Sequence, residues 1–504
     1  MPTTDNGDGR PNVLFVMADD HAANAIGAYG SHLRPVTPTA HIDRLAREGA
    51  RLDNCVCTNS ICAPSRATIL TGQHSHHNGV LTLADDIDPD RRHLAHHLRD
   101  AGYRTGIVGK WHLGTEPQGF DYFNVLPGQG RYDDPILQER GEPWDGDGRV
   151  YEGYSADVIA DQALAWLRGE VGDGCGHDED PFFLQCHFKA PHRAWRYPDR
   201  HADLFADTTI PEPPSLFEDK SHRSEATRER GSTISAENDV QPMVGEAKAG
   251  DLGRDGPVDM AGMDEAERTR VAYQRYLKDY LRTVAAIDDN VGRLLGYLDE
   301  AGLADDTLVI YTSDQGMFLG EHDHYDKRWM YEESLQMPFI ARYPGSIPAD
   351  TFVEDLGANI DFAPTILDYA GVDVPTSMDG RSFRANLSGE SSATCREAVY
   401  YRYWMHLAHH DVPAHYGLRT ERYTLAFFYG LPLDASGAVD EESTPGWELY
   451  DLQRDPYELH NGYDHPDYAE IQEDLKRRLA DRKAALGDED DQYPRLAALR
   501  EEHW

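Results

Sequence analysis

Lysine is scarce in this sequence of 504 residues, and long apolar runs are absent from it. Only eight of the 48 basic residues are lysine. No apolar run approaches the ~20 residues that a membrane-spanning helix needs. Residues 1–10 are polar and contain neither the apolar core of a secretory signal nor a twin-arginine pair. We therefore expect a cytoplasmic protein without a membrane partner.

Cysteine is also rare, and its spacing fits neither a disulfide framework nor a zinc site. The six cysteines are Cys55, Cys57, Cys62, Cys175, Cys186 and Cys395. Buried cysteines usually behave as small apolar residues. We expect reduced, buried thiols at every position except Cys62.

Positive charge is outnumbered, with 48 basic against 89 acidic residues and a net charge of −41. So negative a field argues against nucleic acid as a partner. The acidic residues are spread along the whole chain, as in proteins from a high-salt cytoplasm, where salt screens the self-repulsion. We expect a halophilic source, and an anionic substrate would need a locally basic pocket.

Strand and helix patterns alternate over most of the chain, which predicts an α/β fold with a large, mostly parallel sheet flanked by helices. Asn12–Ala18 and Thr307–Thr312 are almost continuously apolar, as are strands buried on both faces. Thr39–Gly49 predicts a helix with Thr39 as its cap. Glu265–Ala301 carries apolar residues at three- and four-residue steps and predicts a long amphipathic helix.

Length and a change of pattern predict two parts. We assign 1–385 to the α/β domain and interpret 205–262, which is rich in polar residues, Pro and Gly, as a surface insertion. Short strand patterns and a final charged helix in 386–504 predict a smaller α+β subdomain with an antiparallel sheet. We expect His406 or His415 from this part at the rim of a binding site.

Two buried strands are each followed by oxygen ligands. Asp19 and Asp20 follow the first, and Asp314 and Gln315 come shortly after the second. Ligands of open α/β sheets bind at the carboxyl ends of the strands, and adjacent carboxylates repel unless a cation lies between them. Hard oxygen ligands without imidazole or thiolate suit Ca²⁺ or Mg²⁺.

Residues 62–72 predict a helix that opens just after Cys62 and ends at Gly72. Pro64 suits an early helical position because its missing N–H would be unsatisfied there. Free N–H groups and the helix dipole favour negative charge near Cys62. This environment suits a nucleophile or a bound oxyanion, although an isolated cysteine is usually only a buried thiol.

Basic side chains follow two further strand patterns. Lys110 and His112 are two residues apart and share one face of an extended chain. A cation and a proton-transfer group on one face suit an anionic ester. Pro181–Phe188 predicts a buried strand that leads to Lys189 and His192, and we interpret Lys189 as a substrate contact or a neighbour.

The pattern Cys-x-Pro-Ser-Arg at residues 62–66 resembles the maturation signature of type I sulfatases, and other segments agree with it. They are Asp19-Asp20, Gly109-Lys110-Trp111-His112-Leu113-Gly114, Ala190-Pro191-His192, Asp314-Gln315 and the hairpin-like segment 447–458.

The resemblance implies an alkaline phosphatase-like fold and a cysteine that a maturation enzyme oxidises to formylglycine. The hydrate of this aldehyde has two hydroxyls, one to attack sulfur and one to expel sulfate later. The implied catalytic residues are Cys62, Arg66, Lys110, His112, His192 and Lys327. The implied ligands of Ca²⁺, or Mg²⁺, are Asp19, Asp20, Asp314, Gln315 and the modified Cys62, with Gln315 in place of the commoner Asn.

The leading hypothesis is hydrolysis of a sulfated carbohydrate, because 20–26 and 326–334 look most like bacterial N-acetylglucosamine-6-sulfatase-type enzymes. The cation, Lys110 and Lys327 would neutralise the sulfate, and His192 or His112 would protonate the leaving oxygen. The alternative is a phosphonate monoester or phosphodiester hydrolase of the same superfamily. A non-catalytic sulfoglycan-binding relative is disfavoured because the motif is intact.

The charge balance makes one prediction about stability. The Debye screening length falls from ~10 Å at 0.1 M to ~3 Å at 1 M salt. Because salt then weakens the repulsion between acidic residues, the midpoint of thermal unfolding should climb steeply with KCl. The Michaelis constant for a small sulfate ester should change much less, because its cationic partners act at contact distance in a buried pocket. The thermal midpoint and the Michaelis constant are both measured over a series of KCl concentrations. A midpoint that does not change with KCl would contradict the halophilic interpretation.

Overall fold

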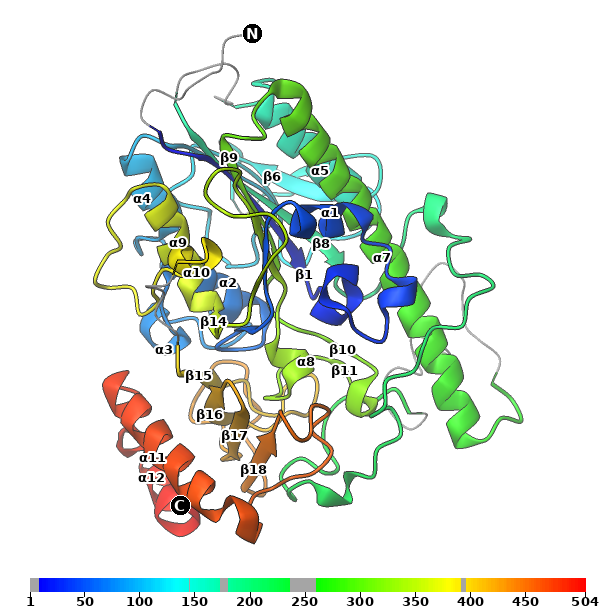
Figure 1. The fold of residues 1–504 in the computed structure, drawn as a ribbon, viewed down its shortest axis with the longest axis vertical. Helices are drawn as coiled ribbons and strands as arrows, with labels where there is room; N and C mark the ends of the chain where they lie inside the picture. Colours follow the sequence, from blue (N-terminus) through cyan, green and yellow to red (C-terminus); the bar gives the residue numbers. More distant parts are fainter. Residues whose placement is uncertain (1–8, 145, 173–179, 236–259, 391–395) are drawn as a thin grey trace.

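The computed structural model describes residues 9–144, 146–172, 180–235, 260–390 and 396–504. Ten described strands form one large sheet that runs through the centre of the molecule (Figure 1). In sheet order they are β13 (Thr351–Val353), β2 (Ala50–Leu52), β12 (Phe339–Arg342), β9 (Thr307–Ser313), β1 (Asn12–Asp19), β8 (Phe182–Pro191), β4 (Arg104–Lys110), β5 (Tyr122–Leu126), β6 (Ile136–Glu139) and β7 (Arg149–Val150).

The middle of this sheet is parallel, as predicted. Strands β9, β1, β8, β4 and β5 pair in parallel, while β12 and β6 add antiparallel neighbours on either side. Every residue of β1, β8 and β9 is buried. Continuous burial explains why these segments are apolar throughout instead of alternating.

Helices cover both faces of the large sheet. One face packs against α1 (Ala40–Arg47), α5 (Ser155–Leu167) and α7 (Glu265–Ala301), and the other faces α2 (Cys62–Thr71), α4 (Leu94–Asp100) and α9 (Phe362–Tyr369). The short elements near them are α3 (Ser75–Asn78), α8 (Glu332–Leu335), α10 (Arg384–Leu387) and the strand pairs β10 (Phe318–Leu319) with β11 (Tyr325–Asp326) and β3 (Cys55–Val56) with β14 (Gly357–Ala358).

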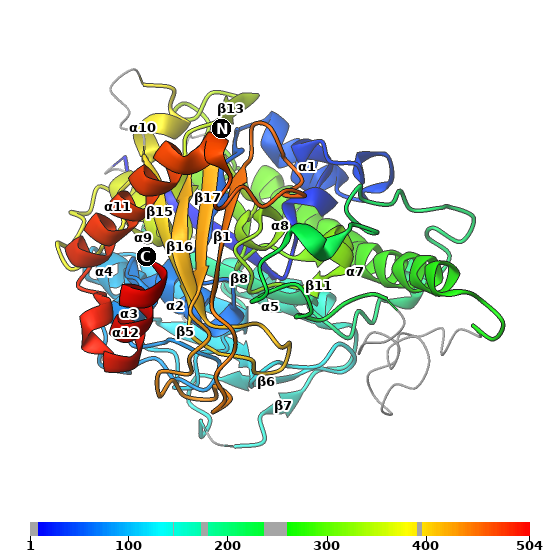
Figure 2. The same ribbon diagram turned by 90° about the horizontal axis from the view of Figure 1, so that it is seen from below.

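A second, antiparallel sheet of four strands lies below the large one in Figure 1 and in front of it in Figure 2, with two helices against it. Its strands are β15 (Ala398–Tyr403), β16 (His415–Thr420), β17 (Tyr423–Phe428) and β18 (Gly446–Asp451), and its helices are α11 (Ala469–Ala485) and α12 (Pro494–His503). The fold class predicted from the sequence is therefore confirmed. Among the described residues, no helix is both long and apolar enough to cross a bilayer.

The described part of the predicted insertion, 205–235, consists of turns and short 3₁₀ segments, and 236–259 lie outside the described residues. Ile210, Leu216 and Ile234 are nevertheless buried against the first half of α7. This segment therefore adds a small apolar core between α7 and the turn that joins β10 to β11.

Three local expectations differ from the structure. Helix α2 begins at Cys62 itself, and β8 continues to Pro191, three residues past the predicted end. His406 and His415 are fully buried in the C-terminal part instead of at a rim. His415 stacks on Tyr401 and Trp329, because the four-stranded sheet packs its aromatic face inward.

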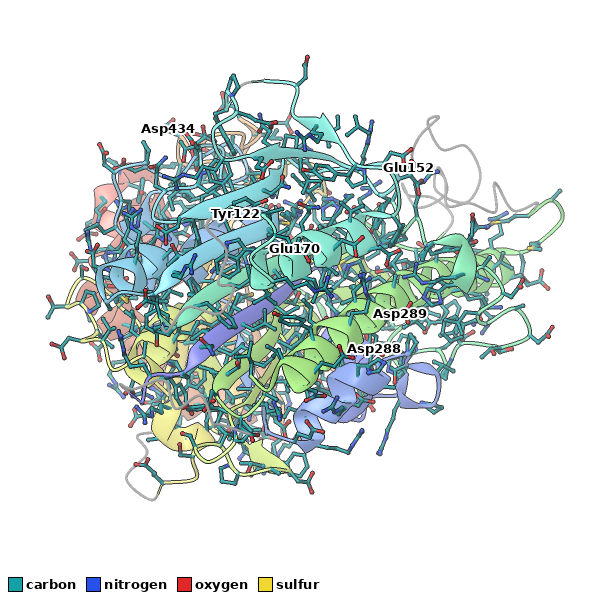
Figure 3. All side chains as sticks on the ribbon, turned by 90° about the horizontal axis from the view of Figure 1, so that it is seen from above. Tyr122, Glu152, Glu170, Asp288, Asp289 and Asp434 are labelled. Carbon is teal, nitrogen blue, oxygen red and sulfur yellow. The ribbon has the colours of Figure 1, made fainter. Side chains whose placement is uncertain are left out.

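Helix α1 is capped from another helix, not by Thr39 as predicted. Thr39 occupies the N-cap position, but its hydroxyl makes no cap hydrogen bond. The buried Asp288 carboxylate of α7 instead accepts the N–H groups of His41 (3.0 Å) and Ile42 (2.9 Å). Figure 3 shows Asp288 beside its helix neighbour Asp289, which pairs with Arg200 at 2.8 Å.

Replacing Asp288 should therefore destabilise the protein more than replacing Asp289. Asp288→Ala leaves the N–H groups of His41 and the buried Ile42 without this partner and should cost about 1–2 kcal/mol of unfolding free energy. Asp289→Ala removes partly exposed contacts with Arg200 and His201 and should cost at most about 1 kcal/mol. Urea unfolding followed by tryptophan fluorescence measures both, and equal losses would contradict the capping role.

Candidate active site

The carboxyl ends of β1 and β9 bring the predicted acidic residues together. Ala18 pairs with Ser313 in the parallel register, so the residues that follow them meet at one edge. The Asp20 backbone N–H donates to Asp314 Oδ1 at 3.1 Å. The carboxylates of Asp19, Asp20 and Asp314 each place an oxygen within 4.8 Å of the others.

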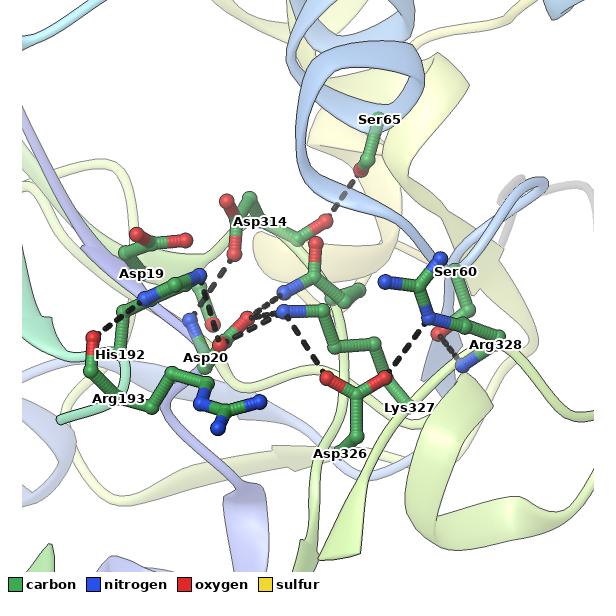
Figure 4. Close-up of polar contacts among 12 residues, drawn as sticks. Asp19, Asp20, Ser60, Ser65, His192, Arg193, Asp314, Asp326, Lys327 and Arg328 are labelled. Atoms are coloured by element: carbon green, nitrogen blue, oxygen red, sulfur yellow. Dashed lines mark hydrogen bonds and ion pairs between the residues drawn. The ribbon is translucent and has the colours of Figure 1, made fainter. Parts of the chain in front are cut away.

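Three buried cations balance these three carboxylates, and Figure 4 shows one of them, Lys327, beside Asp20. Lys110 Nζ makes a short ion pair with Asp19, and Lys327 Nζ lies 2.6 and 2.7 Å from the two Asp20 oxygens. Arg66 Nε donates to Asp314 Oδ2 at 2.9 Å. All six side chains are at most 3% exposed. Five separate segments, from β1, α2, β4, β9 and the turn after β11, thus supply one charge-balanced cluster.

Burial and neighbouring charge set the protonation of the three carboxyl groups. Burial raises the pKa of Asp20 to about 7 although Lys327 opposes the shift. Burial, with the charge of Asp19, also raises the pKa of Asp314 to about 6. Burial disfavours the Asp19 carboxylate too, but Lys110, His192 and Arg66 hold its pKa well below the usual value. An additional cation would favour the ionised form of all three.

The first residue of α2, Cys62, faces this cluster. Its sulfur lies within 4.8 Å of an Asp19 oxygen and a His192 ring nitrogen. Ser65 on the same helix donates a short hydrogen bond to the Asp314 carbonyl, which joins the helix to the end of β9. Burial raises the pKa of the Cys62 thiol above its usual value. An unmodified Cys62 is therefore a thiol and a poor nucleophile, since the thiolate is the reactive form.

His192 follows β8 and turns its Nε2 toward the carboxylates, 3.8 Å from Asp20 Oδ2. Its Nδ1 lies 2.8 Å from the Arg193 carbonyl, which favours a proton on Nδ1. Tyr132 donates a short hydrogen bond to the His192 carbonyl. Burial lowers the pKa of His192, although the negative charge of Asp19 opposes this shift. These contacts fix the ring with one nitrogen directed at the site.

His112 and Lys189 belong to the same electrostatic environment. Burial and the Lys110 charge lower the pKa of His112, whose Nδ1 has no hydrogen-bond partner among the described residues. Burial, again with Lys110, lowers the pKa of Lys189 to about 8, and its Nζ lies 4.9 Å from the centre of the Tyr132 ring. His187 in β8 is a core histidine, since it is buried and its Nδ1 contacts the Lys110 carbonyl.

The donor set fits a hard divalent cation. Buried Asp19 Oδ1 and Gln315 Oε1 have no hydrogen-bond partner in the described parts of the chain. Gln315 Nε2 instead donates to Asp20 Oδ1 at 2.5 Å. Which end of an amide is N and which is O is an assignment, and a half-turn would place the Gln315 oxygen beside Asp20. Carboxylate and amide oxygens are ligands suited to Ca²⁺ and Mg²⁺.

Sequence reasoning missed a second layer around Lys327. Asp326 pairs with Arg328 at 2.9 Å and lies 3.4 Å from His410 Nε2, which comes from the C-terminal part. Asp326 and Arg328 both have positive φ, 83° and 92°, a rare conformation for residues with side chains. The charged triplet Asp-Lys-Arg was visible in the sequence, but nothing there indicated that His410 would reach it.

Two residues that flank Lys327 in the sequence lie outside the cluster around Asp19, Asp20 and Asp314. His322 contacts Glu218 at 2.6 Å, and Glu332 pairs with Arg419 at 2.7 Å.

Comparisons with known proteins agree with the geometry. The family profile described as Sulfatase matches residues 11–372, and that of the N-sulphoglucosamine sulphohydrolase C-terminal region matches 320–485. The chain is 39% identical to an N-acetylglucosamine-6-O-sulfatase of Bacteroides thetaiotaomicron over 95% of this chain and 88% of that protein.

Two solved structures are similar to this chain in fold. One, a complex with its substrate D-glucosamine-2-N,6-O-disulfate, has 37% identity and a TM-score of 0.85, covering 96% of this chain and 100% of that one. A phosphonate monoester hydrolase from Silicibacter pomeroyi shares the fold, with a TM-score of 0.69 and 22% identity over 94% of this chain and 96% of that one. The chain belongs to the sulfatase family.

Proposed function

We propose that this sulfatase removes a 6-O-sulfate from N-acetylglucosamine or a related glucosamine, using a formylglycine made from Cys62 and a divalent cation, Ca²⁺ or Mg²⁺. The observation that carries the proposal is the position of Cys62 at a helix N-terminus, within 4.8 Å of Asp19 and His192. The names of the 39% identical relative and of the complexed structure support the choice of sugar.

The unmodified Cys62 side chain is not a suitable nucleophile for a sulfate ester. A serine at this position would be trapped as a stable sulfate ester, and a buried thiol is a poor nucleophile. The aldehyde hydrate supplies one hydroxyl to attack and a second whose loss of a proton releases sulfate. A maturation enzyme is therefore a necessary partner of this chain.

The cations of the site recognise the sulfate group. Lys110 and Lys327 now pair with Asp19 and Asp20, and a sulfate beside residue 62 would offer the same ammonium groups anionic oxygens. A cation bound by the carboxylates would stabilise charge on the sulfate oxygens. Fixed charges in a dry pocket are worth more than in water because they need no reorganisation.

A histidine must protonate the leaving alcohol oxygen of the sugar. His192 and His112 are the candidates, and burial lowers the pKa of both. A bound sulfate ester adds negative charge beside them, which raises the pKa of a nearby imidazole and favours its protonated form. General-acid help of this kind is typically worth ~10²–10⁴ in rate.

The function is tested by side-by-side assays of sugar sulfate, phosphodiester and phosphonate esters, using protein coexpressed with a formylglycine-generating enzyme. We expect the 6-O-sulfate to have the highest kcat/KM and peptide mass spectrometry to show an aldehyde at position 62. Cys62→Ala should lose at least about 10³-fold in kcat. The matched control is Cys57→Ala, another buried cysteine.

Two results would contradict this function. One is a higher kcat/KM for the phosphonate ester, which would favour the alternative hydrolase. The other is substantial sulfatase activity in Cys62→Ala, which would remove position 62 from the nucleophile's role.

The cation is tested by chelation. Removal of divalent ions should abolish turnover, because buried Asp19, Asp20 and Asp314 would lose the charge that offsets their repulsion and polarises the sulfate. Ca²⁺ or Mg²⁺ should restore it. Asp314→Asn should raise the cation concentration needed for half-maximal activity at least about tenfold.

The matched control is Asp368→Asn, which changes a surface carboxylate paired with Arg384 at 3.2 Å. Full activity after exhaustive chelation, or an equal effect of the two substitutions, would contradict the cation site.

A further inference from the structure

A second group of possible metal ligands lies away from Cys62. The imidazole of His322 and the carboxylates of Glu333 and Glu458 each place one ligand atom within 4.8 Å of the others. His322 is 0% and Glu458 1% exposed, and the Glu333 side chain is 10% exposed. None of the three belongs to the cluster around Asp19 and Asp20.

The atoms that converge in this group lack partners. His322 Nε2, Glu333 Oε2 and Glu458 Oε1 are buried and have no hydrogen-bond partner among the residues the structure describes. Buried polar atoms are nearly always satisfied, so three unsatisfied atoms directed at one point need an explanation. A bound metal ion is one such explanation, and the arrangement of the three ligand atoms favours a particular class of ion.

The histidine is oriented as a metal ligand. Its Nδ1 lies 2.6 Å from Glu218 Oε2, and Glu218 is held in turn by a short ion pair with Arg223. A carboxylate on Nδ1 keeps the proton there and leaves the Nε2 lone pair free. This carboxylate–histidine pair is the usual outer support of a metal-bound imidazole.

The carboxylates of Glu333 and Glu458 each have an oxygen that is free to bind a cation. Glu458 Oε2 accepts the Glu332 backbone N–H at 2.8 Å, which leaves Oε1 free. Nearby Glu332 has its own partner, Arg419, whereas for Glu333 and Glu458 no Lys or Arg lies within ion-pair distance in the described ranges. Burial raises the pKa of both carboxyl groups, and the charge of Glu321 adds to the shift at Glu333 and that of Glu332 to the shift at Glu458. The pair therefore needs either protons or a metal ion.

We propose that His322, Glu333 and Glu458 form a second metal site, which takes a divalent transition-metal ion such as Zn²⁺. Two carboxylates and a neutral imidazole carry a charge of −2, which neutralises a divalent ion. Imidazole nitrogen suits Zn²⁺ and disfavours Ca²⁺, which takes oxygen ligands. Ligands about 2.0–2.2 Å from a tetrahedral Zn²⁺ lie about 3.5 Å apart, and His322 Nε2 is 3.7 Å from Glu333 Oε2.

The site borders a cavity and has a structural consequence. Glu333 lines a cavity of about 720 Å³, whose lining includes none of the residues around Cys62. His322 and Glu333 bracket the segment that carries Lys327, and Glu458 comes from the C-terminal part. A bound ion would therefore tie this segment to the C-terminal sheet.

The test is Zn²⁺ titration of protein that has been stripped of metal and then saturated with Ca²⁺, which fills the oxygen site at Asp19. We expect one Zn²⁺ per chain, a higher thermal midpoint with Zn²⁺, and a Co²⁺ absorption spectrum characteristic of nitrogen ligation. Glu458→Gln should weaken Zn²⁺ binding at least about tenfold. Its metal-free midpoint should not fall, because the substitution removes one of two repelling charges.

Glu332→Gln is the matched control, since it changes the adjacent carboxylate that pairs with Arg419, and it should bind Zn²⁺ like the unaltered protein. The proposal is overturned if the Ca²⁺-saturated protein binds no Zn²⁺, if excess Ca²⁺ displaces Zn²⁺, or if Glu458→Gln binds it as tightly as the unaltered protein.

Discussion

The fold depends on a balance of buried charge at one edge of the large sheet. Asp19, Asp20 and Asp314 lie in an interior where each carboxylate alone would cost several kcal/mol. Lys110, Lys327 and Arg66 offset this cost at contact distances. Because the six residues come from five segments, the cluster forms only when the sheet, α2 and the turn after β11 are all in place.

A buried cluster of charges stabilises a protein less than apolar packing of the same volume often does. Replacing a buried ion pair with apolar residues is often neutral or stabilising, whereas removing one partner costs about 3–5 kcal/mol. Its position at the carboxyl ends of parallel strands, where α/β proteins bind ligands, gives it a different use. It keeps strong charges in a dry pocket beside residue 62. An enzyme for an anionic ester needs that arrangement even though the chain as a whole carries −41.

Local signals in the sequence predicted much of this structure. The buried strands β1 and β9 and the helix Glu265–Ala301 have the predicted type and nearly the predicted bounds. Their patterns are strong because continuous burial or a 3.6-residue period repeats over many residues. The oxygen ligands at the ends of β1 and β9 were predicted to meet because the carboxyl ends of the parallel strands lie at the same edge of the sheet.

The rest depended on tertiary contacts. Asp288 caps α1 across more than 240 positions of sequence, so the cap could not be inferred from Thr39. His415 looked polar and exposed but is buried in an aromatic stack of the second sheet. His410 approaches Asp326 only because that sheet packs beneath the large one. The sequence carries no local mark of any of these contacts.

The central claim is that the carboxyl edge of β1 and β9 holds a divalent cation beside residue 62. The most direct measurement is anomalous diffraction from crystals of the matured protein grown with Mn²⁺ in place of Ca²⁺. We predict one strong peak in contact with oxygens of Asp19, Asp20, Asp314 and Gln315. A fully ordered site with no peak there, and with Lys110 and Lys327 still paired to the two aspartates, would contradict the account.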